Sequence, residues 1–98
     1  MTYGVIIRVP FPIQAYHAAR AEIVKVLGSA SPDGLIVHVA RATDAGFEML
    51  EIWESKEQSE RFNDEIAGPA VNRSGAPAEG PHAVFETFEP VRLEIPDR

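Results

Sequence analysis

The sequence predicts a single α+β domain with the element order β-α-β-β-α-β, and three observations support this prediction. Two strand-like runs, GLIVHVARA (34–42) and GFEMLEIW (46–53), are joined by a turn short enough to force antiparallel pairing. A helix start, Ser55-Lys56-Glu57-Gln58, follows the second run at once. A strand and a helix precede this hairpin, and another strand follows the second helix, which completes the plan.

Size and composition limit the possible classes of protein. The chain has 98 residues and no cysteine, so we expect one domain over residues 1–98 without disulfides. A chain of this length buries only about 60–65% of its unfolded surface, which favours a homodimer. The start MTYGVIIRVPF lacks the features of a signal peptide, and no apolar run reaches a membrane span, so we expect a cytoplasmic protein without a membrane partner. A net charge of −6 with scattered basic residues excludes nucleic-acid binding.

The first half of the chain reads as a strand, a helix and a turn. Alternating apolar residues predict a strand over residues 3–9, ended by Pro10. A helix is expected from Pro12 to Leu27, with Gly28 as its left-handed cap. Its apolar stripe is the set Ile13, Tyr16, Ile23, Val24 and Leu27. Pro32-Asp33-Gly34 predicts the turn into the hairpin, whose two faces both carry apolar residues and should both be covered.

The second half contains a polar helix, a loop and the last strand. We expect the helix to start at Ser55, with a capping box in which Ser55 and Gln58 each satisfy a backbone donor, and to end near Gly68-Pro69 with a possible turn to Asn72. Residues 73–81 predict a surface loop, and residues 83–88 a strand. After Pro90 the segment 91–95 is expected as an edge strand or as part of an arm, residues 90–98, that pairs with a partner subunit.

Three segments of the chain, GLIVHVA, LEIWES and ERFNDEIAGPAV, resemble the dimeric α+β barrel superfamily, and within it small proteins near the antibiotic biosynthesis monooxygenase family. The resemblance covers about residues 3–88. It implies a ferredoxin-like protomer with both helices on one sheet face, a dimer formed through the other face, and a small pocket between sheet and helices. Family monooxygenases oxidise aromatic polyketide-type molecules with oxygen and without metal or flavin. Trp53 matches the family's tryptophan on the third strand.

A haem-degrading branch of the same superfamily uses an asparagine on the first strand and a histidine on the second helix. The first strand here offers Arg8 and no asparagine, and residues 55–68 contain no histidine. The resemblance therefore does not extend to haem ligation, and we expect no cofactor.

Two residues are candidates for catalysis. His38 lies in the middle of the second strand and could act as a base or donor at the pocket wall, or be a half-buried histidine bonded to the backbone. Arg20 interrupts the apolar stripe of the first helix. It could hold an acidic or phenolate ligand, pair with Glu51 or Glu86, or extend its head into water over an apolar stem.

Tyr16, Trp53 and Phe62 are candidates for substrate binding, although aromatic residues at such positions are more often core. The three histidines, His17, His38 and His82, have no ligand-like spacing, so we expect no metal site. Glu48, Glu51 and Glu54 do not form an acid pair by spacing. Two functions remain open: a cofactor-independent monooxygenase-like enzyme acting on a small aromatic or polyketide-type molecule, and a non-catalytic homodimer that binds a small ligand or acts as a structural accessory.

Overall fold

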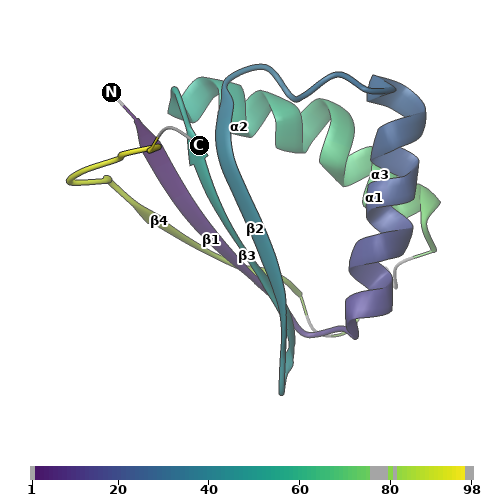
Figure 1. Ribbon diagram of the computed structural model, residues 1–98. Helices are drawn as coiled ribbons and strands as arrows, with labels where there is room; N and C mark the ends of the chain where they lie inside the picture. The colour runs from purple at the N-terminus through teal and green to yellow at the C-terminus, as the bar shows by residue number, and fades with distance from the viewer. Residues whose placement is uncertain (1, 76–79, 81, 97–98) are drawn as a thin grey trace.

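The computed structural model has a four-stranded antiparallel sheet with all helices on one face, and it describes residues 2–75, 80 and 82–96. The strand order is β2-β3-β1-β4, so the first strand lies inside the sheet and the β2 and β4 strands form its edges. This order is that of the predicted β-α-β-β-α-β plan, which is confirmed (Figure 1). The elements are β1 (Tyr3–Val9), α1 (Ile13–Leu27), β2 (Leu35–Thr43), β3 (Gly46–Trp53), α2 (Lys56–Phe62), the π-helical turn η1 (Asn63–Ala67), α3 (Gly68–Arg73) and β4 (Val84–Phe88).

The β2–β3 hairpin has the predicted position and a two-residue turn, Asp44-Ala45. The turn before it also forms as expected, because the Leu35 amide donates to the Pro32 carbonyl and Gly34 takes a φ of 87°. One feature of the hairpin was not foreseen. A β-bulge between Leu35 and Val37 shifts the register, so Leu35 faces the same side as His38 instead of the opposite side.

Helix α1 begins and ends where the sequence predicts, with Pro12 before it and Gly28 after it at a φ of 63°. Apart from Tyr16, however, its apolar stripe is not packed closely onto the sheet: no residue of α1 is buried, and Val24 is 46% exposed. In Figure 1 the helix stands apart from the strands over most of its length. Among the described residues, no helix is both long and apolar enough to cross a membrane.

The second helical segment does not end at Gly68-Pro69, and the further turn to Asn72 that the sequence allowed does form. Elements α2, η1 and α3 follow one another without a break, and the helix runs to Arg73. A proline normally breaks a helix, because it lacks an amide hydrogen and its ring meets a carbonyl one turn earlier. Here the wider π turn precedes Pro69, and the Gly68 amide donates to the Asn63 carbonyl five residues back. This change of hydrogen-bond register accommodates the proline.

The predicted capping box is half correct. The Ser55 hydroxyl accepts a hydrogen bond from the Gln58 amide at 3.2 Å, as expected for an N-cap. The Gln58 side chain, however, does not return to the backbone of Ser55. Its carbonyl oxygen accepts from the Ser55 hydroxyl at 2.9 Å, and its amide nitrogen donates to Asp33 at 3.3 Å. The helix start is thereby tied to the turn that leads into β2.

The ends of helices α1 and α3 are held together by Glu22. Its carboxylate accepts from Lys25 at 2.7 Å and from Arg73, on α3, at 3.3 Å. The hydrogen bond from Lys25 lowers the pKa of the Glu22 carboxyl, and Arg73 adds to this effect. The ion pair between Glu22 and Arg73 links the two helices on the same side of the sheet.

The loop and tail predictions are tested only in part. Of the expected loop 73–81, Arg73 belongs to α3, and residues 76–79 and 81 lie outside the described residues. In the tail, residues 89–96 contain no helix or strand, so the expected edge strand does not form within a single chain. Val91 and Ile95 are strongly exposed there. Pairing of this arm with a partner subunit stays a prediction.

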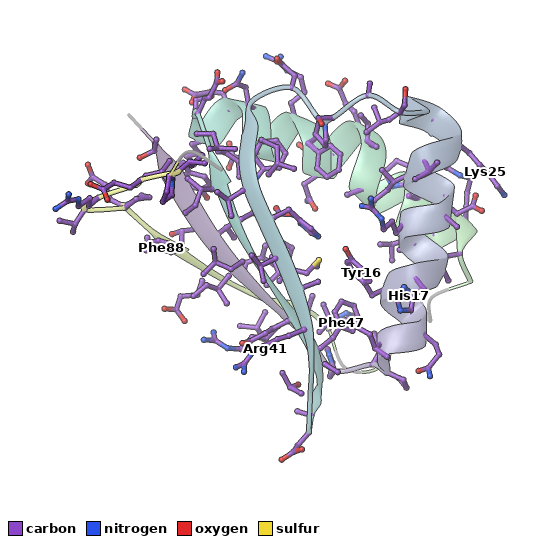
Figure 2. All side chains as sticks on the ribbon, in the orientation of Figure 1. Tyr16, His17, Lys25, Arg41, Phe47 and Phe88 are labelled. Carbon is purple, nitrogen blue, oxygen red and sulfur yellow. The ribbon has the colours of Figure 1, made fainter. Side chains whose placement is uncertain are left out.

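The alternation of side chains gives the sheet two different faces. The inner face, toward the helices, carries His38 and Glu51 among apolar residues. The outer face carries two mostly apolar rows and one mostly charged row, and it is exposed in part: Val39 is 54% exposed and Val84 60%, whereas Ile52 is buried. Arg41 and Phe88, on this face, point away from the helices in Figure 2.

Gly46 is the glycine that the fold depends on most. A methyl group added at Gly46 would overlap the backbone carbonyl oxygens of Val9 and Phe11, and the residue takes a φ of 153°. We expect Gly46→Ala to lower the free energy of unfolding by about 1–3 kcal/mol, because backbone atoms cannot move aside as a side chain can. Gly28→Ala is the control: its φ is also positive, but no atom lies within 4 Å of the added carbon. Chemical denaturation of both variants measures the difference, and equal losses would contradict the steric argument.

Candidate active site

A large cavity lies between the helices and the inner face of the sheet. Its volume is about 1470 Å³, above the roughly 300–1,000 Å³ of most small-molecule pockets, and it is open to solvent. Helix α1 contributes Tyr16, Arg20 and Ile23, and the second helical segment contributes Phe62 and Asn63. Because α1 buries no residue, its apolar stripe serves as a wall of this cavity instead of packing as core.

A pair of polar side chains lies on the floor of the cavity. His38 on β2 and Glu51 on β3 are direct cross-strand partners, and His38 Nδ1 lies 2.8 Å from Glu51 Oε2. The Glu51 side chain is 9% exposed and that of His38 25%. A carboxylate in such surroundings is destabilised by several kcal/mol unless hydrogen bonds replace water. The stability of the Glu51 carboxylate in this position therefore depends on its hydrogen-bond donors.

Trp53 supplies the second partner of Glu51. The indole nitrogen of Trp53 donates to Glu51 Oε1 at 3.1 Å, so each carboxylate oxygen has its own donor. Trp53 is fully buried, and its ring packs against that of Phe62 with centroids 5.4 Å apart. Among the described residues, no buried side-chain nitrogen or oxygen lacks a hydrogen-bond partner. The carboxylate is thus fixed in orientation and satisfied.

Tyr16 completes the chain of hydrogen bonds from the helix side. Its hydroxyl lies 2.8 Å from His38 Nε2, and the two ring planes are within 13° of each other. Figure 2 shows the Tyr16 side chain directed from α1 toward the sheet, near Phe47, whose ring it meets edge-on at 5.7 Å. With Glu51 as a carboxylate, which only accepts hydrogen bonds, and a neutral imidazole, His38 donates from Nδ1 to Glu51 and accepts at Nε2 from the Tyr16 hydroxyl.

We call these four residues, Tyr16, His38, Glu51 and Trp53, the relay. The relay runs from a hydroxyl at the cavity wall to a buried indole. A substrate cannot easily reach His38 Nε2, because the Tyr16 oxygen already occupies that position. A proton taken from a ligand would therefore pass through the Tyr16 hydroxyl. This arrangement suits general-base chemistry, in which an oriented imidazole accepts a proton within hydrogen-bond reach.

Arg20 lies on the same helix, one turn after Tyr16, and lines the same cavity. Neither ion pair considered from the sequence forms: Glu51 is held by His38 and Trp53, and Glu86 binds Arg8 on the outer face. The residue is exposed, and within the described part of the chain no carboxylate pairs with it. Its guanidinium is therefore available to an anionic group of a ligand that enters the cavity.

The structure brings four of the five candidate residues to the cavity: His38, Arg20, Tyr16 and Phe62 line it. Trp53 does not, and it reaches the site only through Glu51. Glu51 is the residue that sequence reasoning missed as a functional group. Counting outward from the Asp44-Ala45 turn places Glu51 opposite His38, so the hairpin register contained this signal.

The other two histidines take no part in the relay. His17 is exposed and meets the edge of the Tyr16 ring, with centroids 5.6 Å apart. His82 lines the cavity near β4. In the part of the chain that the structure describes, no group of three or more histidine, aspartate or glutamate side chains is arranged to hold a metal ion.

No family model matches this chain, and no curated protein matches it in sequence. Solved structures do match it over nearly its whole length. The Rv0793 protein of Mycobacterium tuberculosis has a TM-score of 0.64 and 16% identity, with 95% of this chain and 98% of that chain covered. A Chloroflexus aurantiacus protein provisionally named an antibiotic biosynthesis monooxygenase has a TM-score of 0.63 and 18% identity, with 96% and 97% covered.

A variant of SnoaB, a cofactor-independent oxygenase from Streptomyces nogalater, also matches. Its TM-score is 0.58 at 11% identity, with 94% of this chain and 93% of that chain covered. At such low sequence identities the similarity shows the fold only, and the chemistry has to be inferred from the residues of the site. The chain therefore has the ferredoxin-like α+β fold of the antibiotic biosynthesis monooxygenase-like structures, as the sequence predicted.

Proposed function

We propose that this chain is a monooxygenase-like enzyme that uses dioxygen directly on a small aromatic or polyketide-type molecule with an acidic hydroxyl or methylene group. One observation carries the proposal: the hydrogen bonds that link Tyr16, His38 and Glu51 at the wall of an open cavity. Fold neighbours described as oxygenases support the reaction class. We also propose a cytoplasmic location, since the chain has no cysteine with which a small exported domain could be cross-linked.

The first step of the proposed reaction is a proton transfer. The acidic group of the substrate gives its proton to the Tyr16 oxygen while the Tyr16 proton moves to His38 Nε2. The imidazolium that forms is stabilised by Glu51, only 2.8 Å from Nδ1. Arg20 stabilises the substrate anion from the same helix. Trp53 and Glu51 act as positioning residues, because they fix the ring of His38 and do not contact the substrate.

The second step consumes dioxygen. The substrate carbanion forms a carbon–oxygen bond with dioxygen, and the resulting peroxide accepts the proton held by the relay. Loss of water from this hydroperoxide leaves a carbonyl group, so a methylene and one dioxygen become a carbonyl and one water. The oxidant is dioxygen, and the reductant is the substrate itself.

The alternative function is a non-catalytic homodimer that binds a small ligand. From the sequence, this reading predicts a closed cavity and an Arg20 paired with a protein carboxylate. The open cavity and the partners of Glu51 and Glu86 favour the enzyme instead. Both readings include a homodimer formed through the outer face of the sheet, which we propose because apolar side chains there are exposed in the single chain.

The relay can be tested with dithranol, a dihydroxyanthrone that carries an acidic methylene group, by following oxygen consumption. We expect His38→Gln and Tyr16→Phe each to lower kcat by about 10²–10⁴-fold, because either change interrupts proton transfer. His17→Gln is the matched control, since this exposed histidine neighbours Tyr16 without joining the relay. Unchanged turnover in His38→Gln, or no oxygen uptake by the wild-type protein, would contradict the proposal.

The role of Glu51 has a spectroscopic test that needs no substrate. Nitrogen NMR of the neutral His38 ring should show the proton on Nδ1 and a lone pair on Nε2, because Glu51 accepts and Tyr16 donates. We expect Glu51→Gln to weaken this preference while circular dichroism shows an intact fold. A His38 ring protonated on Nε2 in the wild-type protein would be inconsistent with the proposed direction of transfer.

Arg20 can be separated from the relay by its kinetics. We expect Arg20→Gln to lower kcat/KM for dithranol by about tenfold, near the small end for a lost anion partner because the side chain is exposed. Arg61→Gln on α2 is the control, since it removes the same charge from an exposed position that does not line the cavity. Equal kinetics in the two variants would show that Arg20 does not bind the substrate.

A further inference from the structure

The relay has the geometry of a nucleophilic triad as well as that of a general base. In such a triad a hydroxyl nucleophile, a histidine that accepts its proton and a carboxylate that orients the histidine form one line of hydrogen bonds. Here the Tyr16 hydroxyl lies 2.8 Å from His38 Nε2, and His38 Nδ1 lies 2.8 Å from Glu51 Oε2. All three roles are therefore filled, with a phenol as the hydroxyl group.

The phenol lies where an incoming molecule meets it first. Tyr16 and His38 line the open cavity, whereas Glu51 is only 9% exposed and is held from its other side by Trp53. A nucleophile has to be reachable while the carboxylate that orients its base stays fixed, and this arrangement meets both conditions. Because the Tyr16 oxygen is already within hydrogen-bond distance of Nε2, its attack on a ligand needs no rearrangement of the relay.

The walls of the cavity suit an acyl group with an apolar body. Val5, Ile7 and Phe47, on the inner face of the sheet, line the cavity beside the relay. Arg20 follows Tyr16 by one turn of α1 and lines the same cavity. When a hydroxyl attacks a carbonyl group, negative charge develops on the carbonyl oxygen, and a neighbouring guanidinium stabilises it. The cavity thus combines a nucleophile, a base and a cation with an apolar surface.

We propose that the relay also performs acyl transfer, with Tyr16 as the nucleophile that takes an acyl group from an aryl ester or a thioester. The Tyr16 oxygen forms a bond with the carbonyl carbon while its proton moves to His38 Nε2. The bond to the leaving group then breaks, and His38 gives this proton to the departing phenol or thiol. Water attacks the acyl-tyrosine by the same steps, which releases a carboxylic acid and restores the Tyr16 hydroxyl. No oxidant takes part, so this activity depends on the relay and not on the proposed oxygen chemistry.

A covalent trap tests whether Tyr16 is a nucleophile. With phenylmethanesulfonyl fluoride, a sulfur–oxygen bond forms, fluoride leaves and the proton passes to His38, which gives a stable sulfonate ester. We expect peptide mass spectrometry to find this label on Tyr16, and His38→Gln to slow labelling about 10²-fold or more, because the proton acceptor is lost. Tyr3 is the internal control: both tyrosines line the cavity, but within the described residues the contact with a histidine nitrogen belongs to Tyr16. Equal labelling of Tyr3 and Tyr16 in the wild-type protein would overturn the proposal, even if His38→Gln does not fold.

Turnover is measured with 4-nitrophenyl benzoate in the absence of dioxygen. Its acyl group has no hydrogen on the carbon next to the carbonyl, so the ester cannot react by loss of a carbon-bound proton. We expect the wild-type protein to release 4-nitrophenol catalytically, and Tyr16→Phe to lower the rate at least about tenfold, because the nucleophile is lost.

Tyr3→Phe is the matched control and should keep the wild-type rate, since it removes a hydroxyl from the same cavity. Equal rates in Tyr16→Phe and the wild-type protein, or no release by the wild-type protein, would overturn acyl transfer. Neither result bears on oxygen uptake with dithranol, and a failure of that uptake leaves ester cleavage standing. The two proposals therefore hold or fail separately.

Discussion

The register of the β2–β3 hairpin is the constraint on which the candidate site depends. A two-residue turn fixes the pairing, and the pairing sets His38 directly opposite Glu51 on the inner face. Since side chains alternate along a strand, a slip of one residue in either strand would place His38 and Glu51 on opposite faces of the sheet. The relay is therefore a consequence of turn length as much as of residue type. Gly46 contributes at the same place, because its small size lets the chain after β1 cross the start of β3.

Burial of a carboxylate at Glu51 makes the site both costly and specific. Water is mostly excluded from this group, so its stability rests on donors from His38 and Trp53. Each donor is itself oriented: Trp53 packs against Phe62, and His38 is held between Glu51 and Tyr16. A fully satisfied polar network of this kind admits one arrangement of its side chains. The group exposed to a ligand is then the hydroxyl of Tyr16, while the imidazole behind it supplies the basicity.

Local patterns in the sequence predict the elements well, and they fail where the outcome depends on distant contacts. The alternation of apolar and polar residues and the positions of prolines and glycines correctly predicted the strands, α1 and the turn at Gly34. Pro69 does not end the helix, because a π turn before it accommodates the proline, and no local sequence pattern predicts that turn. The packing of α1 could not be predicted, because an apolar stripe has the same spacing whether it meets a sheet or lines a cavity. His38 and Tyr16 were found singly, but their contact joins a strand to a helix, and Glu51 was overlooked because strand spacing was considered without the partner strand.

Neighbouring residues on the same strand serve different faces of the sheet, and each face requires different side chains. On β3, Glu51 must point inward to orient His38, while its near neighbours Leu50 and Ile52 point outward to the apolar rows. Because these residues alternate, the register that assembles the relay also decides which side chains of β2 and β3 lie on the outer face. A substitution that shifts the hairpin would thus disturb the cavity and the outer face together. In contrast, a reversal of charge at Arg41 or Glu86, whose side chains lie on the outer face alone, leaves the hydrogen bonds of the relay intact.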